Sequence, residues 1–280
     1  MTHEKPILVL GSTGKTGRRV VERLTARGIP TRMGVRSGEP PFDWDDPDTW
    51  APVLQGVGSV YVQHYLDALP GAAEILGSFA ELAVGHGIPR LVHLSGRGEP
   101  EAELAAQAVR DTGAEVTTLR STWFSQNFSE SYFLDGLLAG ELALPAGNTP
   151  EPFVDADDIA DVAVAALTDD RHIGEVYELT GPRLLTFAEA IEEIARAAGR
   201  EIRYVPVSIE EHEAAAAEQG VPGETIDLLT HLFNEVMDGR NAHVTDGVQR
   251  VLGRAPRDFR DYAEAAAATG VWNAPALASA

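Results

Sequence analysis

Three glycines, each separated from the next by two residues, stand between an apolar run and a run with helical periodicity. They are Gly11, Gly14 and Gly17, in the segment GSTGKTG that follows PILVL. In this context the first glycine allows a tight turn, the second lets a pyrophosphate approach the backbone, and the third lets helix and strand pack closely. The alternative is a tight turn that binds nothing. We expect a dinucleotide to contact the whole turn, which comprises Gly11, Ser12, Thr13, Gly14, Lys15, Thr16 and Gly17.

The end of the second expected strand carries an arginine where proteins that bind NAD usually carry an acidic residue. That acidic residue, about 20 residues after the glycines, holds a ribose 2′-hydroxyl. Here the segment reads Val35-Arg36-Ser37. A forked cation suits a 2′-phosphate, and Lys15 and the Ser37 hydroxyl would add to it. These residues predict NADP(H) rather than NAD(H); the alternative for Arg36 is a solvated surface side chain.

Apolar runs and helix-like runs alternate along the first 120 residues with short connections. The pattern predicts strands over 6–10, 30–36, 59–63, 89–95 and 115–120. It predicts helices over 15–27, 46–54, 72–86 and 102–112. Such alternation is typical of an α/β protein with a Rossmann-like, doubly wound parallel sheet.

The pattern is looser in the second half, where helices become more frequent. We expect helices over 130–140, 155–167 and 186–199, extended segments over 175–179 and 200–207, and mainly helix from Ser208 onward. The predicted domains are an NADP(H)-binding Rossmann domain over 1–150, to which 151–180 returns, and a mainly helical C-terminal substrate lobe over 181–280. The apolar face of 226–240 is expected to pack on the sheet domain or to close the substrate pocket; a partner groove or a homodimer face is the alternative.

Composition narrows the classes of function. The net charge of -21 disfavours nucleic acid and acidic membranes as partners. The chain has no cysteine, which excludes disulfides and thiolate chemistry. It lacks a signal peptide or a membrane-spanning segment, and we expect a soluble cytoplasmic protein. The acidic residues Asp155, Asp157 and Asp158 fit a capped helix start better than a metal site, so no metal is predicted.

Several ordered motifs resemble one family. GSTGKTG with Arg36 resembles the NmrA-like, atypical branch of the short-chain dehydrogenase/reductase superfamily. The stretches LVHLSG (91–96), TTLRSTWFSQNF (117–128) and EPFVDADDIADVAVAAL (151–167) resemble further family segments, so that the match runs over nearly the whole chain. The resemblance implies either an NADPH-dependent quinone or dye reductase, or a regulator that binds the cofactor without turning it over.

The catalytic dyad of typical relatives is missing. They use Tyr-x-x-x-Lys, in which the lysine lowers the pKa of the tyrosine. None of the six tyrosines has a lysine four residues later, and the only lysines are Lys5 and Lys15. Where the dyad is expected, the chain reads GEPEAELAAQA. Ser95 stands at the position that matches the family's active-site serine.

Ligands of a doubly wound sheet lie at the carboxyl ends of the strands, and this selects the remaining candidates. After the third strand come Gln63, near the cofactor, and His64 and Tyr65 as proton donors. After the fourth strand comes Ser95, which would orient the substrate and contact the cofactor. Trp123, Phe124 and Phe233 would form an apolar wall of the substrate pocket, with core packing as an equal alternative for Trp123 and Phe124. His64 as a plain loop residue and His93 as a hydrogen-bonded core histidine are the alternatives for the two histidines.

Two classes of function follow. The first is an NADPH-dependent oxidoreductase that reduces a quinone, an enone or a related conjugated carbonyl by direct hydride transfer, without the dyad. The second is a redox-sensing regulator that binds NADP(H) and holds a protein partner. A reductase of an imine or ketone in secondary metabolism differs from the first only in its substrate. We expect a small-molecule substrate, and favour the enzyme because a lobe able to form a pocket is retained.

Overall fold

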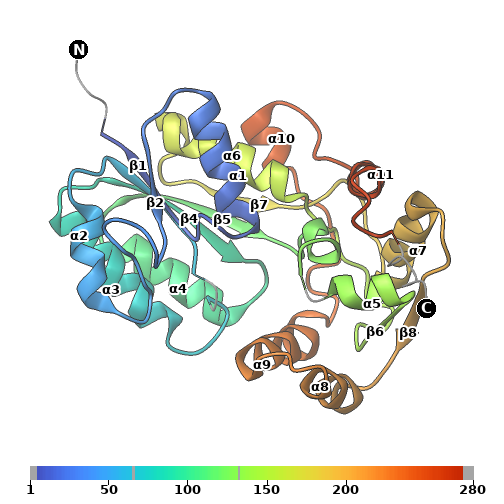
Figure 1. Cartoon of the computed structure of the whole chain (residues 1–280). Coiled ribbons are helices and arrows are strands. Elements are labelled where there is room, and N and C mark those ends of the chain that lie inside the picture. The colour runs from blue at the N-terminus through green and yellow to red at the C-terminus, as the bar shows by residue number, and fades with distance from the viewer. Residues whose placement is uncertain (1–4, 65–66, 132, 274–280) are drawn as a thin grey trace. The chain divides into compact units, whose positions relative to one another are not determined.

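The structure, a computed structural model, describes residues 5–64, 67–131 and 133–273 (Figure 1). The chain divides into two compact units, each built from three separate segments. The first unit comprises the described residues of 1–121, 156–179 and 246–255. The second comprises those of 122–155, 180–245 and 256–280. Within the described residues, no helix is long and apolar enough to cross a membrane.

A six-stranded sheet forms the centre of the first unit. Its order is β2 (Thr31–Gly34), β1 (Ile7–Leu10), β3 (Ser59–Val62), β4 (Arg90–Gly96), β5 (Glu115–Ser121) and β7 (Val176–Leu179). Every neighbouring pair is parallel. The side chains of β1 and β3 are buried throughout, which explains their continuous apolar sequence. The chain leaves β1 toward β2 on one side and later returns to β3 on the other, so the strand order reverses beside β1. The predicted Rossmann-like fold is confirmed.

Helices cover both faces of this sheet (Figure 1). One layer contains α1 (Lys15–Ala26), α6 (Ala156–Thr168) and α10 (Gly247–Leu252). The other contains α2 (Trp50–Leu54), α3 (Ala72–Gly85) and α4 (Pro100–Asp111), with the 3-10 turn Pro47–Thr49 ahead of α2. A second 3-10 turn, Asp170–His172, precedes β7. Because all neighbouring strands are parallel, their carboxyl ends lie at the same edge of the sheet.

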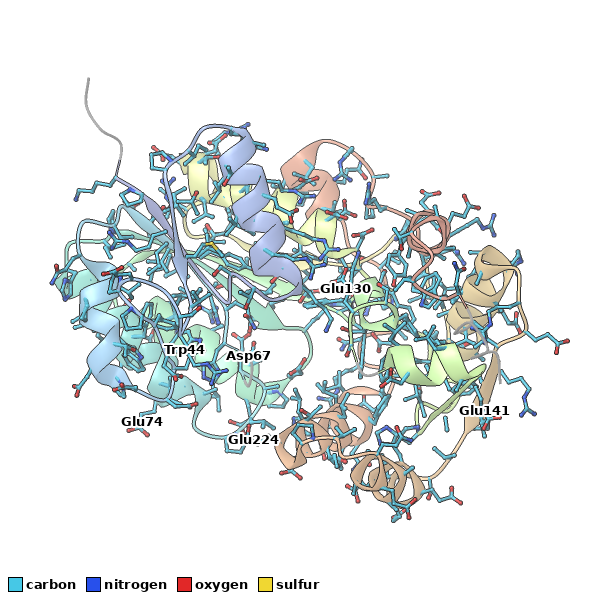
Figure 2. The ribbon with its side chains drawn as sticks, viewed as in Figure 1. Trp44, Asp67, Glu74, Glu130, Glu141 and Glu224 are labelled. Atoms are coloured by element: carbon cyan, nitrogen blue, oxygen red, sulfur yellow. The ribbon has the colours of Figure 1, made fainter. Side chains whose placement is uncertain are left out.

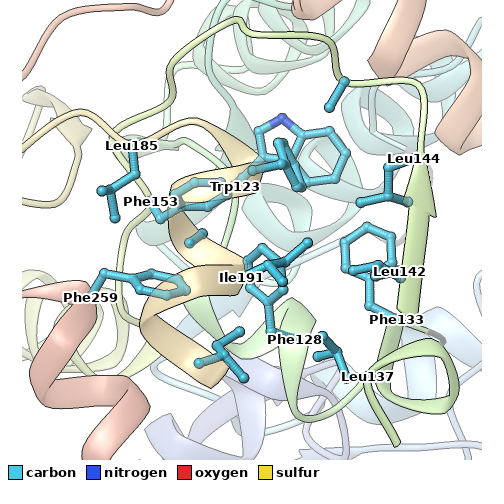
Figure 3. Packing of buried hydrophobic residues seen from close by; sticks show 14 of the residues in the cluster. Trp123, Phe128, Phe133, Leu137, Leu142, Leu144, Phe153, Leu185, Ile191 and Phe259 are labelled. Carbon is cyan, nitrogen blue, oxygen red and sulfur yellow. The ribbon is translucent and has the colours of Figure 1, made fainter. Parts of the chain in front are cut away.

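The second unit is mainly helical and has its own core. It contains α5 (Phe133–Ala139), α7 (Phe187–Ala198), α8 (Ile209–Glu218), α9 (Gly223–His231) and α11 (Phe259–Ala268). A 3-10 turn spans Ser125–Phe128, and β6 (Glu141–Leu144) and β8 (Arg203–Pro206) form a two-stranded parallel sheet. Capping boxes begin α7 at Thr186 and α8 at Ser208. Figure 3 shows the aromatic side chains that fill this core.

The structure differs from the sequence expectations at three places. Residues 141–144, for which the sequence predicted no element, form a strand because they pair with β8, about 60 residues later. Residues 232–236 form a π-helix within the expected helix 226–240. The segment 246–255, expected in the helical lobe, carries α10 and belongs to the sheet unit. The first segment of the sheet unit ends at residue 121. The predicted domain boundaries themselves stay a prediction.

Candidate cofactor and active site

The glycine turn connects β1 to α1 and is held by its own backbone. Gly11 has φ of 61°, a conformation that disfavours a side chain. The N–H of Gly14 donates a hydrogen bond of 2.9 Å to the carbonyl oxygen of Gly11. A Cβ on Gly17 would stand 2.2 Å from the same oxygen. Helix α1 therefore begins directly against the turn, as the glycine spacing predicts.

The residues at the start of α1 fit an anion. The N-cap of α1 is Gly14, no side chain caps the helix, and its first turn holds no acidic residue. Thr13 and Gly14 are exposed. The hydroxyl of Ser12 is buried and has no hydrogen-bond partner among the described residues. A helix start with uncapped N–H groups, an orphaned hydroxyl and no competing carboxylate suits a pyrophosphate.

Two further residues of the turn have internal contacts. The hydroxyl of Thr16 is buried and accepts a hydrogen bond of 3.0 Å from the hydroxyl of Tyr61 on β3. This contact anchors the start of α1 to the sheet. Lys15 is half-buried, and its carbonyl oxygen accepts a hydrogen bond of 2.8 Å from Arg19. Direct contacts of Thr16 and Lys15 with a cofactor stay predictions.

Arg36 and Ser37 lie in an exposed turn directly after β2. The carbonyl oxygen of Val35 accepts hydrogen bonds of 3.0 Å from the N–H groups of Gly38 and Phe42, and this fixes the turn. Within residues 5–64, 67–131 and 133–273, Arg36 makes no ion pair. Its guanidinium is therefore available to an anion without the loss of an existing partner.

Gln63 and His64 follow β3 in different surroundings. The side-chain oxygen of Gln63 lies over the glycine turn, 2.1 Å from where a Cβ on Gly11 would stand. His64 is buried, with its ring centroid 4.9 Å from that of Trp44. Burial lowers the pKa of His64 to about 4, although the charge of Asp45 opposes this. The imidazole is neutral at pH 7, which makes it a weak proton donor. Tyr65 lies outside the described residues, so its predicted role stays a prediction.

Ser95 lies near the end of β4 beside two carboxyl groups. Ser95 is buried and donates a hydrogen bond of 3.2 Å to the carbonyl oxygen of Ala102 in α4. The N–H of Gly96 donates a hydrogen bond of 3.1 Å to Oδ2 of Asp67, which follows β3 and is labelled in Figure 2. The carboxyl of Glu99, the N-cap residue of α4, lies against Gly96 from another side: a Cβ there would stand 2.2 Å from Glu99 Oε1.

The pKa values of both carboxyl groups are raised. Burial raises the pKa of Asp67 to about 7, against hydrogen bonds from Ser95 and from backbone N–H groups that lower it. Burial and then the charge of Asp67 raise the pKa of Glu99 to about 8. Paired groups with raised pKa values at strand ends are typical of sites that move protons. Sequence reasoning missed both residues, although Glu99 lies in the stretch noted for its missing dyad.

His93 corrects one expectation. It lies in β4 and is fully buried, but neither ring nitrogen has a hydrogen-bond partner in the described part of the chain. It is therefore not a hydrogen-bonded core histidine. Burial lowers the pKa of His93 to about 3, with a further lowering from the charge of Arg110. The ring is neutral, and both of its nitrogens are without a hydrogen bond among the described residues.

The three residues expected in the substrate pocket all belong to the second unit. Trp123 and Phe233 are buried and stack with ring centroids 5.2 Å apart. Phe233 lies in the π-helix, a feature often found at functional sites. Phe124 is half-buried, and its backbone bridges to Val154. A pocket role for the three stays a prediction.

The acidic start of α6 is occupied by ion pairs. Asp157 accepts a hydrogen bond of 2.7 Å from Arg23, and Asp158 pairs with Arg254 at 2.7 Å. Asp155, just before the helix, accepts one of 2.8 Å from Gln126. Among the described residues, no group of three or more acidic or histidine side chains is arranged to hold a metal ion.

Curated relatives match over nearly the full length of the chain. An oxidoreductase of Bacillus subtilis (strain 168), named YesF and uncharacterized, is 32% identical, with 97% of this chain and 99% of the relative covered. An NAD(P)H azoreductase of Xenophilus azovorans is 30% identical, covering 94% of this chain and 98% of its own. No protein-family model matches the chain.

Solved structures share the fold at lower identity. The negative transcriptional regulator NmrA superimposes with a TM-score of 0.67 at 17% identity, over 93% of this chain and 95% of its own. Because the relatives at 32% and 30% identity match over nearly the whole chain, the chain belongs to the NmrA-like, atypical branch of the short-chain dehydrogenase/reductase superfamily. Triphenylmethane reductase of Citrobacter sp., solved with NADP(H), has a TM-score of 0.74 at 20% identity, over 93% of this chain and 99% of its own. An NADPH-dependent quinone oxidoreductase of Escherichia coli also has 0.74 at 20%, over 94% and 99%. The two relatives at 32% and 30% identity confirm the predicted family and its oxidoreductase class, and the solved structures confirm the fold.

Proposed function

We propose that this chain is an NADPH-dependent reductase of a quinone, an enone or a related conjugated carbonyl. The proposal rests on the anion-ready start of α1 together with Arg36, which is exposed and makes no ion pair within the described residues. The glycine turn would hold the pyrophosphate, and Arg36, Ser37 and Lys15 would hold the 2′-phosphate. Relatives and fold neighbours whose names include NAD(P)H, NADP(H) or NADPH support this cofactor.

When bound, the reduced nicotinamide supplies a hydride with its two electrons. The chain's own residues would position the acceptor and manage its proton. Ser95 lies at the carboxyl end of β4, where a doubly wound sheet receives its ligands, and its buried hydroxyl would orient the acceptor. Gln63 lies over the glycine turn, where its amide would contact the cofactor. No Tyr-x-x-x-Lys dyad exists in the sequence, and these residues would act in its place.

The proposed class of acceptor follows from the absence of the Tyr-x-x-x-Lys dyad. A simple ketone accepts hydride only with strong activation of its oxygen, whereas a conjugated acceptor spreads the new charge and needs less. The experiment is NADPH oxidation by the purified full chain with quinones, enones and simple ketones. We expect turnover with conjugated acceptors and at least tenfold less with simple ketones. An absence of turnover with every acceptor, despite NADPH binding, would remove the proposal.

The second candidate function is an NADP(H)-binding regulator without turnover. The fold neighbour NmrA, a negative transcriptional regulator, favours it. A regulator should bind NADP+ and NADPH with different affinities and retain a protein partner in one state only. Comparison of the two affinities, together with the acceptor assay, separates the two functions. Only the enzyme oxidises NADPH with an acceptor when no protein partner is present.

A further inference from the structure

Two carboxyl groups meet at Gly96 from different elements of the sheet unit. Asp67 comes from the segment after β3 and Glu99 from the start of α4. The Oδ2 atom of Asp67 is 3.1 Å from the N–H nitrogen of Gly96. The Oε1 atom of Glu99 occupies the space where any larger residue at 96 would place its Cβ. The two acids are thus within a few ångströms of one backbone position, beside the buried hydroxyl of Ser95.

Hydrogen bonding distinguishes the two acids. Asp67 receives backbone hydrogen bonds from Gly96 and Ala68 and a side-chain hydrogen bond from Ser95, all of which favour its carboxylate form. Glu99 receives none of these, and the negative charge of Asp67 adds to the effect of burial. The proton that the pair retains near neutral pH is therefore held mainly by Glu99.

The other charged and titratable groups nearby do not neutralise Asp67 or Glu99. Arg97, on the same strand end, is occupied by an ion pair of 2.9 Å with Glu178 of β7. His64, after β3, is neutral at pH 7 for the reasons given above. On α4, Glu101 carries a further negative charge and Glu103 pairs with Arg110 at 2.8 Å. Within the described residues, neither Asp67 nor Glu99 pairs with an arginine or a lysine.

We propose that Glu99 is the proton donor of the reduction and that Asp67 positions it and keeps it protonated. This inference rests on the proposed reductase function. As hydride adds to the β-carbon of an enone, the C=C π electrons would shift to form a double bond between the α-carbon and the carbonyl carbon, and the C=O π electrons would move to oxygen. Glu99 would transfer its proton to that oxygen, which gives an enol that isomerises to the saturated ketone in water. The acceptor is reduced by two electrons, and the Glu99 carboxylate then recovers a proton from water.

The test compares two acceptors with different proton demands. An enone needs a proton on its oxygen as hydride arrives, whereas a cationic triarylmethane dye becomes neutral on accepting hydride and needs none. The variants are Glu99→Gln, Asp67→Asn and, as a control on the same helix, Glu101→Gln. Rates are measured with the full chain at saturating NADPH from pH 5.5 to 9.5, and NADPH affinity is measured separately by fluorescence.

In the wild type, we expect the enone rate to fall as pH rises through about 8, because Glu99 loses its proton. Glu99→Gln should lower the ratio of enone to dye rates by about 100-fold, the usual contribution of a general acid, and should abolish that pH dependence. Asp67→Asn should move the fall in rate to lower pH, because the charge that opposes ionisation of Glu99 is gone. NADPH affinity should change less than threefold in each variant.

Two results would overturn the donor role. One is a Glu99→Gln variant with the wild-type enone rate and pH profile; the other is an equal loss with both acceptors, which would indicate a structural role. If the wild type reduces neither acceptor, the proposed function fails instead. Carbon NMR titration of the carboxyl groups of glutamate-labelled protein without cofactor tests the proton at Glu99 independently of any reductase activity. A signal that titrates near pH 8 and is absent in Glu99→Gln supports the held proton, whereas an ordinary titration near 4.5 contradicts it.

Discussion

The carbonyl oxygen of Gly11 lies 2.2 Å from the point where a Cβ on Gly17 would stand. The backbone carbon of Gly11 would be 2.7 Å from it, and the Cα atom of Ser12 3.0 Å. All three neighbours are backbone atoms, which cannot turn aside as a long side chain can. The close approach of α1 to the turn is thus set by the absence of a side chain at 17, and it places the first N–H groups of the helix where an anion would bind.

Gly17→Ala should therefore displace the start of α1. We expect the free energy of unfolding to fall by about 1–3 kcal/mol, the usual cost of overpacking. NADPH affinity should fall at least tenfold, because the N–H groups move away from the phosphates. Urea unfolding and fluorescence titration measure the two effects. Gly85→Ala, which meets no atom within 4 Å, is the matched control and should change neither by much. Wild-type affinity in Gly17→Ala would show that α1 does not contact the cofactor.

The raised pKa of Glu99 makes the folded protein less stable as pH rises. Between about pH 4.5 and 8 the folded state holds a proton at Glu99 that the unfolded state has lost, so the free energy of unfolding decreases across this range. Glu99→Gln removes the effect, because glutamine resembles the protonated acid. Relative to the wild type, the variant should gain about 1–3 kcal/mol between pH 5.5 and 8.5, a figure reduced for partial exposure. Urea unfolding at both pH values checks this, and an equal difference at the two would contradict the raised pKa. Glu101→Gln should show no such gain.

His93 should have the opposite pH dependence. Its pKa is about 3 in the folded protein against 6.5 in the unfolded chain, so stability is lost as pH falls below 6.5. His93→Leu removes both this loss and a buried ring without hydrogen bonds. We expect the variant to gain about 1.4 kcal/mol on the wild type between pH 7.5 and 5.5. Thermal or urea unfolding of His93→Leu and of the exposed control His86→Gln measures the gain. A pH-independent difference would show that the folded protein binds a proton at His93 as readily as the unfolded chain does, which contradicts the lowered pKa.

Local signals in the sequence predicted the sheet and the glycine turn because each depends on neighbouring residues. The apolar run before Gly11 and the helical periodicity after Lys15 are visible within about 20 residues. The strand 141–144 was missed because its partner is 203–206, and no local pattern links them. In the same way α10 returns to the sheet unit although its sequence neighbours do not.

The candidate active site could likewise be predicted only where a residue's place depends on its neighbours in the sequence. Arg36 could be found because its place after the second strand is set by local spacing. Asp67 and Glu99 come from separate elements and meet at Gly96. The N–H of Gly96 binds Asp67, and the missing side chain of Gly96 leaves space for Glu99. A glycine followed three residues later by an acid at a strand end was the one available signal.

The most direct test of the account is a fluorescence titration of the wild type and of Arg36→Ala with NADPH and with NADH. The control variant is Arg27→Ala, an arginine at the end of α1 that is also exposed. We predict that the wild type and Arg27→Ala bind NADPH at least tenfold more tightly than NADH. In Arg36→Ala the NADPH affinity should fall to about that for NADH, because only NADPH carries the 2′-phosphate. Equal affinity of the wild type for both nucleotides, or an unchanged preference in Arg36→Ala, would contradict the NADP(H) site proposed at this turn.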